Sequence, residues 1–206
     1  GVNLTVPLKE LGARCADRLT PDAARLAACN TLVRGDEGWL GTNTDCEGFR
    51  RAVLDAGGRL DGTVVVLGAG GAARAVVGAL GPTAEGVVLN RTVERARSLV
   101  EALGAHAYGP LERFSSLRPD LVVVAVSGPG NDAIAGLSLA GLPEQALWMD
   151  LNYWCPDPPH REALQARGNP FDDGLGMLLH QGALAFEHFT GVTPDLAIGR
   201  RALGTA

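Results

Sequence analysis

The sequence predicts an α/β protein whose central part is a doubly wound, parallel sheet of the Rossmann type. Residues 63–67 (TVVVL) form an uninterrupted apolar run, which is typical of a strand buried on both faces. Strand-like and helix-like segments then alternate, as they do when crossover helices join parallel strands. The chain has 206 residues and 46% hydrophobic content, so it can bury the core of one large or two small domains.

The segments before this part predict shorter elements. A strand at 2–6 (VNLTV) is ended by Pro7, and 8–19 is a plausible helix. Thr20-Pro21-Asp22 predicts the start of a second helix, because it combines a side-chain cap, a proline at the first helical position and an acid near the positive end of the helix dipole. Next come two strands, at 29–34 and 38–44, which are joined as a hairpin through residues 35–38. A helix at 45–57 follows them.

The alternating pattern continues through most of the remaining chain. It predicts three helices and three strands after the first buried strand: helices at 71–80, 93–103 and 158–168, and strands at 86–92, 120–127 and 146–153. The last part is helical again, with one helix at 176–191. Thr193-Pro194-Asp195 then opens a final helix.

A glycine-rich turn follows the first buried strand and opens a helix. Gly68-Ala69-Gly70-Gly71-Ala72-Ala73 matches G-x-G-x-x-A, in which the first glycine allows the tight turn and the second lets the backbone approach a pyrophosphate. The small third residue lets the helix and the strand pack closely, while the helix N-terminus faces the phosphate charge. The turn therefore predicts a dinucleotide-binding site at Gly68, Ala69, Gly70, Gly71 and Ala72.

The end of the next strand indicates which dinucleotide binds. An NAD site usually has Asp or Glu there, which accepts a hydrogen bond from the ribose 2′-hydroxyl. This chain has Asn90-Arg91-Thr92, with Arg95 one turn further on. Arg91 can bind a 2′-phosphate bidentately, and Thr92 can donate its hydroxyl. A solvated helix start is the alternative, but two arginines there oppose the helix dipole. A docked anion explains them better, so the sequence favours NADP.

Composition argues against several kinds of partner. The net charge is −5 and the arginines are dispersed, which argues against a nucleic-acid surface. No apolar run is long enough to span a membrane. Cys15, Cys29, Cys46 and Cys155 lie far apart, which predicts reduced thiols in a cytoplasmic protein. Two histidines in the 176–191 helix have no further ligand, so we predict no metal site.

Lys9 is the single lysine among the 18 basic residues, and every other one is arginine. An ammonium group can release a proton during catalysis, whereas a guanidinium stays protonated at working pH. This difference predicts chemistry at Lys9. On spacing alone, a surface lysine whose stem covers apolar neighbours is an equal alternative.

Several segments, taken together, resemble the shikimate dehydrogenase family: VNLTVPLK, AACNT, GTNTDCEGF, GAGGAAR, NRT with Arg95, and GMLLHQGALAFEHFTG. They occur in order along nearly the whole chain. The resemblance implies reversible, NADPH-dependent reduction of 3-dehydroshikimate to shikimate, in the pathway to chorismate and the aromatic amino acids. It also implies a partial α/β substrate-binding domain built from both chain ends, residues 1–44 and 177–206. Residues 45–176 would form the NADP-binding domain, including a linking helix.

The same resemblance implies roles for individual residues. Lys9 and Asp45 match the catalytic pair, in which the lysine supplies a positive charge and a proton at the developing alkoxide and the aspartate orients it. Asp45 is also expected to cap the helix at 45–57. The expected substrate-binding residues are Thr5, Lys9, Asn30, Asp45, Tyr153 and Gln181. The expected cofactor-binding residues are residues 68–72, Asn90, Arg91, Thr92, Arg95 and Gly174.

Two departures from the family pattern bear on activity. Members usually carry a strand–helix–strand–helix segment before NLTVPLK, with a serine pair that holds the substrate carboxylate. The sequence starts at this motif, either because the protein is truncated or because its numbering starts late. If the protein is truncated, we expect weak or absent turnover, intact NADP binding, and association through exposed sheet edges. The second departure is the loop Ser127-Gly128-Pro129-Gly130-Asn131, which stands where relatives have a polar segment near the nicotinamide.

Three alternatives stay open. The chain could bind NADP with impaired turnover, or it could be a quinate/shikimate dehydrogenase that prefers NAD, which Arg91 disfavours. A folate-linked Rossmann enzyme would leave the GTNTD and HQGALAF segments unexplained. The expected partners are a small-molecule substrate and the cofactor, without nucleic acid or membrane, in a monomer or homodimer.

Overall fold

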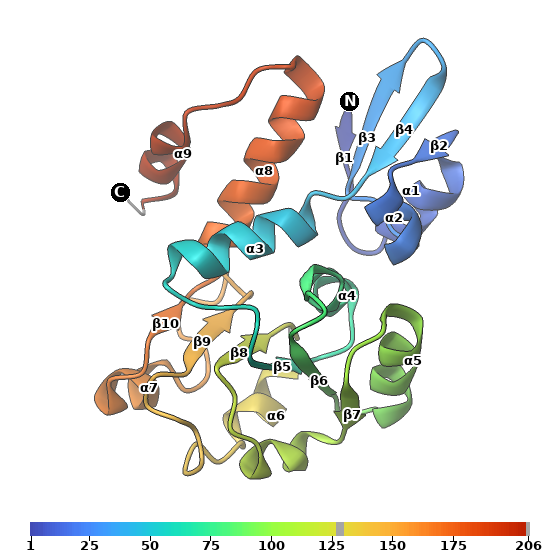
Figure 1. Cartoon of the computed structure of the whole chain (residues 1–206). Helices are drawn as coiled ribbons and strands as arrows, with labels where there is room; N and C mark the ends of the chain where they lie inside the picture. Colours follow the sequence, from blue (N-terminus) through green and yellow to red (C-terminus); the bar gives the residue numbers. More distant parts are fainter. Residues whose placement is uncertain (127–129, 205–206) are drawn as a thin grey trace.

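Six parallel strands form the larger of two sheets in the computed structural model, which describes residues 1–126 and 130–204 (Figure 1). In sheet order the strands are β10 (Phe171–Asp172), β9 (Leu147–Asp150), β8 (Leu121–Val124), β5 (Thr63–Leu67), β6 (Glu85–Leu89) and β7 (Ala107–Gly109). The strand order runs outward in both directions from β5 and β8, which is the Rossmann arrangement. The predicted α/β class with a doubly wound parallel sheet is confirmed.

The core of this unit explains why its strands are apolar throughout. Val64 and Val66 are fully buried in one apolar cluster, whereas Val65 and Leu67 are fully buried in another on the opposite face. Side chains alternate between the two faces of a strand, so both faces of β5 are covered. The helices that accompany the strands are α4 (Gly71–Ala79), α5 (Val93–Leu103), the 3-10 helix η1 (Leu111–Ser116), α6 (Gly130–Ala135) and α7 (Arg161–Arg167).

A second, four-stranded sheet lies at the N-terminal end of the chain. Its order is β1 (Val2–Asn3), β3 (Thr31–Gly35), β4 (Gly38–Thr42) and β2 (Arg18–Leu19). β3 and β4 form the predicted antiparallel hairpin, and β2 pairs parallel to β4. Two short helices, α1 (Lys9–Cys15) and α2 (Pro21–Leu26), belong to this part. The hydroxyl of Thr20 accepts from Ala23 N at 3.4 Å, as the capping prediction requires.

Two predicted elements in this part were wrong in their extent. The predicted helix at 8–19 ends at Cys15, because Asp17 N and Thr20 N donate to carbonyls of β4 and draw Arg18–Leu19 into the sheet as β2. The predicted strand at 2–6 is β1 alone, Val2–Asn3. After Leu4 the chain turns, and Leu8 N donates to Thr5 O at 2.7 Å.

Helix α3 (Asp45–Asp55) lies between the two sheets in Figure 1. It packs against α4 and, most extensively, against α8 (Leu175–Thr190). A Cβ atom at Gly48 would lie 2.8 Å from the backbone nitrogen of Gln181. The close contact of α3 with α8 therefore needs a glycine at position 48. The final helix is α9 (Leu196–Leu203), capped by the carboxylate of Asp195.

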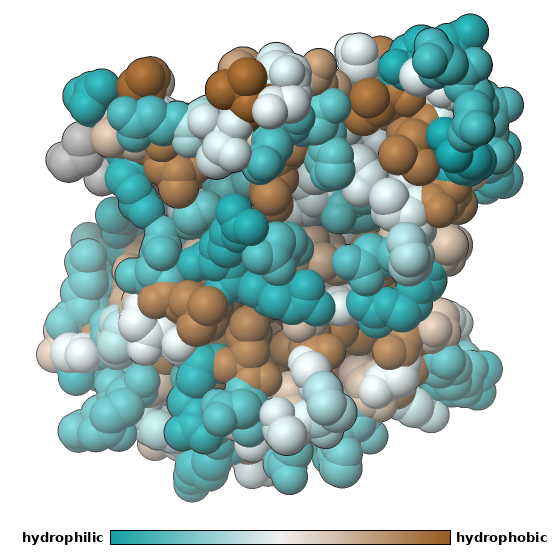
Figure 2. All heavy atoms as spheres, turned by 45° about the horizontal axis from the view of Figure 1, so that its top comes forward, coloured by the Kyte–Doolittle hydropathy of each residue, from teal (hydrophilic) through white to brown (hydrophobic). Residues whose placement is uncertain are grey.

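Apolar side chains are exposed on the face of the molecule drawn in Figure 2. Figure 2 shows apolar residues in several separate areas among polar ones. Within residues 1–126 and 130–204, no helix has both the length and the apolar character needed to cross a bilayer. The four cysteines are free thiols, and burial raises the pKa of Cys46 to about 12, which leaves this thiol unreactive at neutral pH.

Candidate active site

A cavity of about 460 Å³ opens between the two sheets, where segments from both parts of the chain meet. One of its walls comes from Ala72 at the start of α4, Leu151 after β9 and Gly174 after β10. In doubly wound folds the ligand crevice lies outside the carboxyl ends of the strands, and this cavity lies there. The structure brings all the predicted substrate-binding residues to its lining: Thr5, Lys9, Asn30, Asp45, Tyr153 and Gln181.

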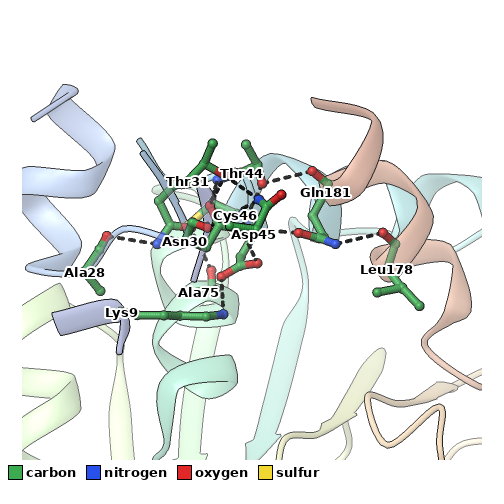
Figure 3. A network of polar contacts seen from close by, with 12 residues as sticks. Lys9, Ala28, Asn30, Thr31, Thr44, Asp45, Cys46, Ala75, Leu178 and Gln181 are labelled. Atoms are coloured by element: carbon green, nitrogen blue, oxygen red, sulfur yellow. Dashed lines mark hydrogen bonds and ion pairs between the residues drawn. The ribbon is translucent and has the colours of Figure 1, made fainter. Parts of the chain in front are cut away.

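Lys9 and Asp45 form an ion pair at the edge of this cavity (Figure 3). The distance from Lys9 Nζ to Asp45 Oδ2 is 2.7 Å. The Lys9 side chain is 19% exposed and that of Asp45 is 7% exposed. The pair is thus shielded from bulk water on most sides, but its ammonium group still reaches the cavity. A partly buried charge of this kind acts more strongly on a bound ligand than one in water.

Asn30 lies at the centre of the polar network around this pair. It follows α2, directly before β3, and it is 2% exposed. Its Nδ2 donates to Asp45 Oδ1 at 2.9 Å and to Thr44 Oγ1 at 2.8 Å, and it lies 3.3 Å from Gln181 Oε1. Its Oδ1 accepts from Thr44 N at 2.9 Å. Asn30 therefore fixes the carboxylate that in turn positions Lys9.

The prediction that Asp45 caps α3 was wrong. Asp45 is the first residue of the helix and Thr44 occupies the cap position, where the Thr44 side chain makes no capping hydrogen bond. The Asp45 N–H donates instead to Asn43 Oδ1 at 3.0 Å. The Asp45 carboxylate is directed at Lys9 and Asn30 because both offer N–H donors on the cavity side. Its position in the first turn is still favourable, since the positive end of the helix dipole stabilises an anion.

Gln181 and Tyr153 approach the cavity from the C-terminal half of the chain. In Figure 3 the Gln181 amide points from α8 toward Asn30, and its Nε2 donates to Leu178 O at 3.0 Å. Tyr153 is 42% exposed and makes an edge-to-face contact with Trp154, with ring centroids 4.8 Å apart. Both aromatic side chains line the cavity. Tyr153 and Trp154 form a partly exposed, apolar rim around the polar interior of the cavity.

The glycine turn has the space that a bound dinucleotide requires. Gly68 has a φ of +121°, and a Cβ there would meet Ala125 O at 2.7 Å, so only glycine fits. A Cβ at Gly70 would meet no atom within 4 Å. The backbone beside Gly70 is therefore open to an approaching group, and no side chain caps α4, which starts at Gly71. These residues fit the pyrophosphate of a dinucleotide.

The arginines after β6 are free to bind an anion. Arg91 and Arg95 are exposed, and within the described residues neither guanidinium has an ion-pair partner. Arg97, which lies in α5 like Arg95, differs because it pairs with Glu94 at 2.9 Å. Asn90 Nδ2 donates to Thr92 O at 2.9 Å, which fixes the turn before α5. The assignment of Arg91, Thr92 and Arg95 to a 2′-phosphate stays a prediction.

Sequence reasoning missed several residues of the network. Thr44 joins the two halves of the site, because its hydroxyl donates to Gln181 O at 3.0 Å. Asn43 Nδ2 donates to Ala28 O, Asn3 Nδ2 donates to Thr31 Oγ1, and Trp154 lines the cavity. Asn43 and Thr44 belong to the GTNTDCEGF segment. The run of polar residues directly before a helix is the sequence signal that could have identified them. Of the predicted nicotinamide-side loop, residues 127–129 lie outside the described residues.

Asp150, at the end of β9, carries a buried carboxyl beside this crevice. Its Oδ1 accepts from Asn152 N at 3.0 Å and Asn152 Nδ2 at 2.6 Å. Its Oδ2 is buried and has no hydrogen-bond partner among the described residues. Burial raises the pKa of Asp150 above its ordinary 3.8, and the bonds from Asn152 only partly offset this. The folded protein therefore holds this proton to a higher pH than the unfolded chain does.

This difference predicts that Asp150→Asn stabilises the protein at neutral pH. Between pH 3.8 and the raised pKa of Asp150, the native state binds more protons than the unfolded state does. The free energy of unfolding therefore falls as the pH rises through that window. A neutral amide removes this cost, and we expect a gain of about 1 kcal/mol, or roughly 2–4 °C in Tm. Thermal unfolding at neutral pH and near pH 4 measures it. A gain that does not shrink at the lower pH would contradict the explanation, and Asp157→Asn is the control.

Comparison with known proteins gives a consistent set of similarities. The family model "Shikimate 5'-dehydrogenase C-terminal domain" matches residues 174–203. The chain is 36% identical to "Shikimate dehydrogenase (NADP(+))" of Exiguobacterium sp., over 98% of this chain and 76% of the relative. It is 41% identical to the protein of that name from Thermus thermophilus, over 99% of this chain and 79% of the relative.

A solved structure shares the fold over nearly the whole chain. It is shikimate 5-dehydrogenase from Thermus thermophilus in complex with NADP(H) and shikimate. The TM-score is 0.87 at 38% sequence identity, and the match covers 98% of this chain and 77% of the solved one. The chain thus spans about three quarters of the length of these relatives.

Proposed function

The chain belongs to the shikimate dehydrogenase family, and from this premise we propose that it interconverts 3-dehydroshikimate and shikimate with NADP, using Lys9 and Asp45 as its catalytic pair. The observation that carries the assignment of the pair is its geometry. An ammonium and a carboxylate 2.7 Å apart face a cavity that also contains the polar groups of Asn30 and Gln181. A ring with several hydroxyl groups needs such a polar interior.

The open glycine turn at 68–72 and the unpaired arginines support the cofactor side of the proposal. We infer that the turn holds the pyrophosphate, that Arg91, Thr92 and Arg95 hold the 2′-phosphate, and that Gly174 lies against the nicotinamide end. When bound, NADP supplies or accepts the hydride. The protein's own part is to place the substrate and to handle the proton.

Lys9 is proposed to act at the oxygen that changes between ketone and hydroxyl. During reduction its ammonium donates a hydrogen bond to the ketone oxygen and gives it the proton as negative charge develops. During oxidation the same amine takes the proton back. Asp45 keeps the ammonium directed at that oxygen through the 2.7 Å contact, and Asn30 holds Asp45 from its other oxygen.

The remaining cavity residues are proposed to orient the ring. Asn30, Gln181 and the hydroxyl of Thr5 offer hydrogen-bond partners inside the cavity, and Tyr153 offers both an apolar face and a hydroxyl at its rim. We place the substrate-binding domain at 1–44 and 177–206 and the NADP-binding domain at 45–176. We also infer a cytoplasmic location, because free thiols are typical of a reducing compartment, and a monomer or homodimer.

The proposed function predicts shikimate-dependent reduction of NADP by the purified chain. The absorbance of NADPH measures the rate, with shikimate omitted in one control and with NAD or quinate substituted in two others. We expect NADP and shikimate to give the highest kcat/KM of these combinations. A rate no higher than that of the Lys9→Met variant would contradict turnover. Calorimetric titration with NADP alone would then show whether the chain binds the cofactor without catalysis.

A further inference from the structure

A buried histidine ties α8 to the far end of α3. His180 is 4% exposed, and its Nε2 lies 2.8 Å from Asp55 Oδ2, at the last residue of α3. The same carboxylate oxygen accepts from Arg200 Nη2 of α9 at 2.6 Å. The hydrogen bond from His180 is the main cause that lowers the pKa of Asp55 below 3.8. Asp55 is therefore an ionised acceptor at neutral pH, which strengthens the bond to the ring N–H.

The residue next to His180 is tied to the opposite end of α3. Gln181 O accepts from the hydroxyl of Thr44, which directly precedes the helix, at 3.0 Å. Between these two ties, Gly48 lets the backbone of Gln181 lie directly on α3. Adjacent residues of α8 therefore contact both ends of the same helix. This arrangement joins α8 to α3 through two separate contacts, one at each end of α3.

We propose that His180, through Asp55, is a positioning residue that sets the rotation of α8 and so holds the Gln181 amide in the substrate cavity beside Asn30. Successive residues project about 100° apart around a helix, so fixing the direction of His180 also fixes the direction of Gln181. A turn of α8 about its own axis would move the Gln181 amide away from Asn30 and Asp45. The inference rests on the proposed function, because Gln181 is there assigned to the substrate.

The chain offers well-matched variants for a test. His180→Leu removes the ring N–H but keeps an apolar side chain in the buried site, and His180→Gln retains an N–H donor. Asp55→Ala removes the acceptor at a half-exposed position, so it tests the same bond if His180→Leu does not fold. His188→Leu is the control, because this histidine is exposed two turns further along α8.

Calorimetric titration of each variant with shikimate and with NADP is the experiment. We expect His180→Leu and Asp55→Ala to raise the Kd for shikimate about tenfold, with NADP affinity unchanged, and His180→Gln to restore most of the loss. Combining His180→Leu with Gln181→Ala distinguishes positioning from mere stability. If His180 acts through Gln181, the double variant binds shikimate no more weakly than Gln181→Ala alone. Additive losses, or equal losses of NADP affinity, would overturn the proposal.

One further measurement separates this proposal from the proposed function. If the unmodified chain binds no shikimate, the assignment of the substrate is wrong, but the position of Gln181 can still be followed. The side-chain amide resonances of Gln181 and Asn30 in NMR spectra should shift in His180→Leu and Asp55→Ala, and not in His188→Leu. Unchanged resonances would show that His180 does not position Gln181.

Discussion

Lys9→Met is expected to lower kcat for shikimate oxidation by about 10²–10⁴-fold, the range typical for the loss of a positioned proton-transfer group. Methionine keeps an unbranched, flexible side chain in the same space but has neither charge nor proton. Affinity for NADP should stay unchanged, because the glycine turn and the arginines after β6 are intact. Steady-state kinetics with shikimate and NADP, beside a titration with NADP, measure both quantities.

Four further variants test this first expectation more closely. Lys9→Arg keeps the positive charge but cannot release its proton at working pH, so it should recover little of the lost rate. Asp45→Asn should also reduce kcat, and the double variant with Lys9→Met should be little worse than Lys9→Met alone, because the two residues act as a unit. Arg14→Met, on the exposed part of α1, is the control for loss of a positive charge. A Lys9→Arg enzyme of normal kcat would contradict the proton-transfer role.

Arg91→Asp is expected to weaken NADP binding by about 10–100-fold, the equivalent of losing one charge-assisted hydrogen-bonded contact. The carboxylate would repel the 2′-phosphate and could accept from a ribose 2′-hydroxyl instead. We therefore expect the preference to shift toward NAD. The ratio of kcat/KM for NADP to that for NAD measures it, together with calorimetric Kd values for both dinucleotides.

Arg97→Asp provides the matched control for this second expectation. It makes the same charge reversal within α5, six residues after Arg91, but Arg97 already pairs with Glu94 and is not part of the proposed phosphate site. An equal loss of NADP affinity in both variants would mean that the general charge of the helix, and not a contact from Arg91, attracts the cofactor. An unchanged affinity in Arg91→Asp would refute the assignment of Arg91.

The sequence predicted those features of the fold whose signal is local. The apolar run at 63–67 and the glycine turn after it define their own structure, since burial on both faces and a positive φ at Gly68 leave few other residue types. The ends of β1, and the existence of β2, had no such local signal. Their extent depends on pairing with β3 and β4, which lie elsewhere in the chain. Sequence periodicity does not contain that information.

In the site, too, the residues with a local sequence signal could be predicted, whereas contacts between distant residues could not. Lys9 and Asp45 could be named from the motifs that contain them, but their 2.7 Å contact could not, because 36 residues separate them. The bond between His180 and Asp55 joins residues 125 positions apart, and neither residue belongs to a local pattern that suggests the other. Asp45 illustrates the opposite error. The local rule favoured a helix cap, whereas the tertiary contacts with Lys9 and Asn30 determined where its carboxylate points.

The glycine at the crossing of α3 and α8 has a consequence for anyone who wants to redesign the specificity of this enzyme. Any larger residue at position 48 would collide with the main chain of Gln181, so position 48 is unsuitable for redesign. The rim, where Tyr153 and Trp154 stand partly in solvent, is where new substrates could be accommodated without rebuilding the scaffold.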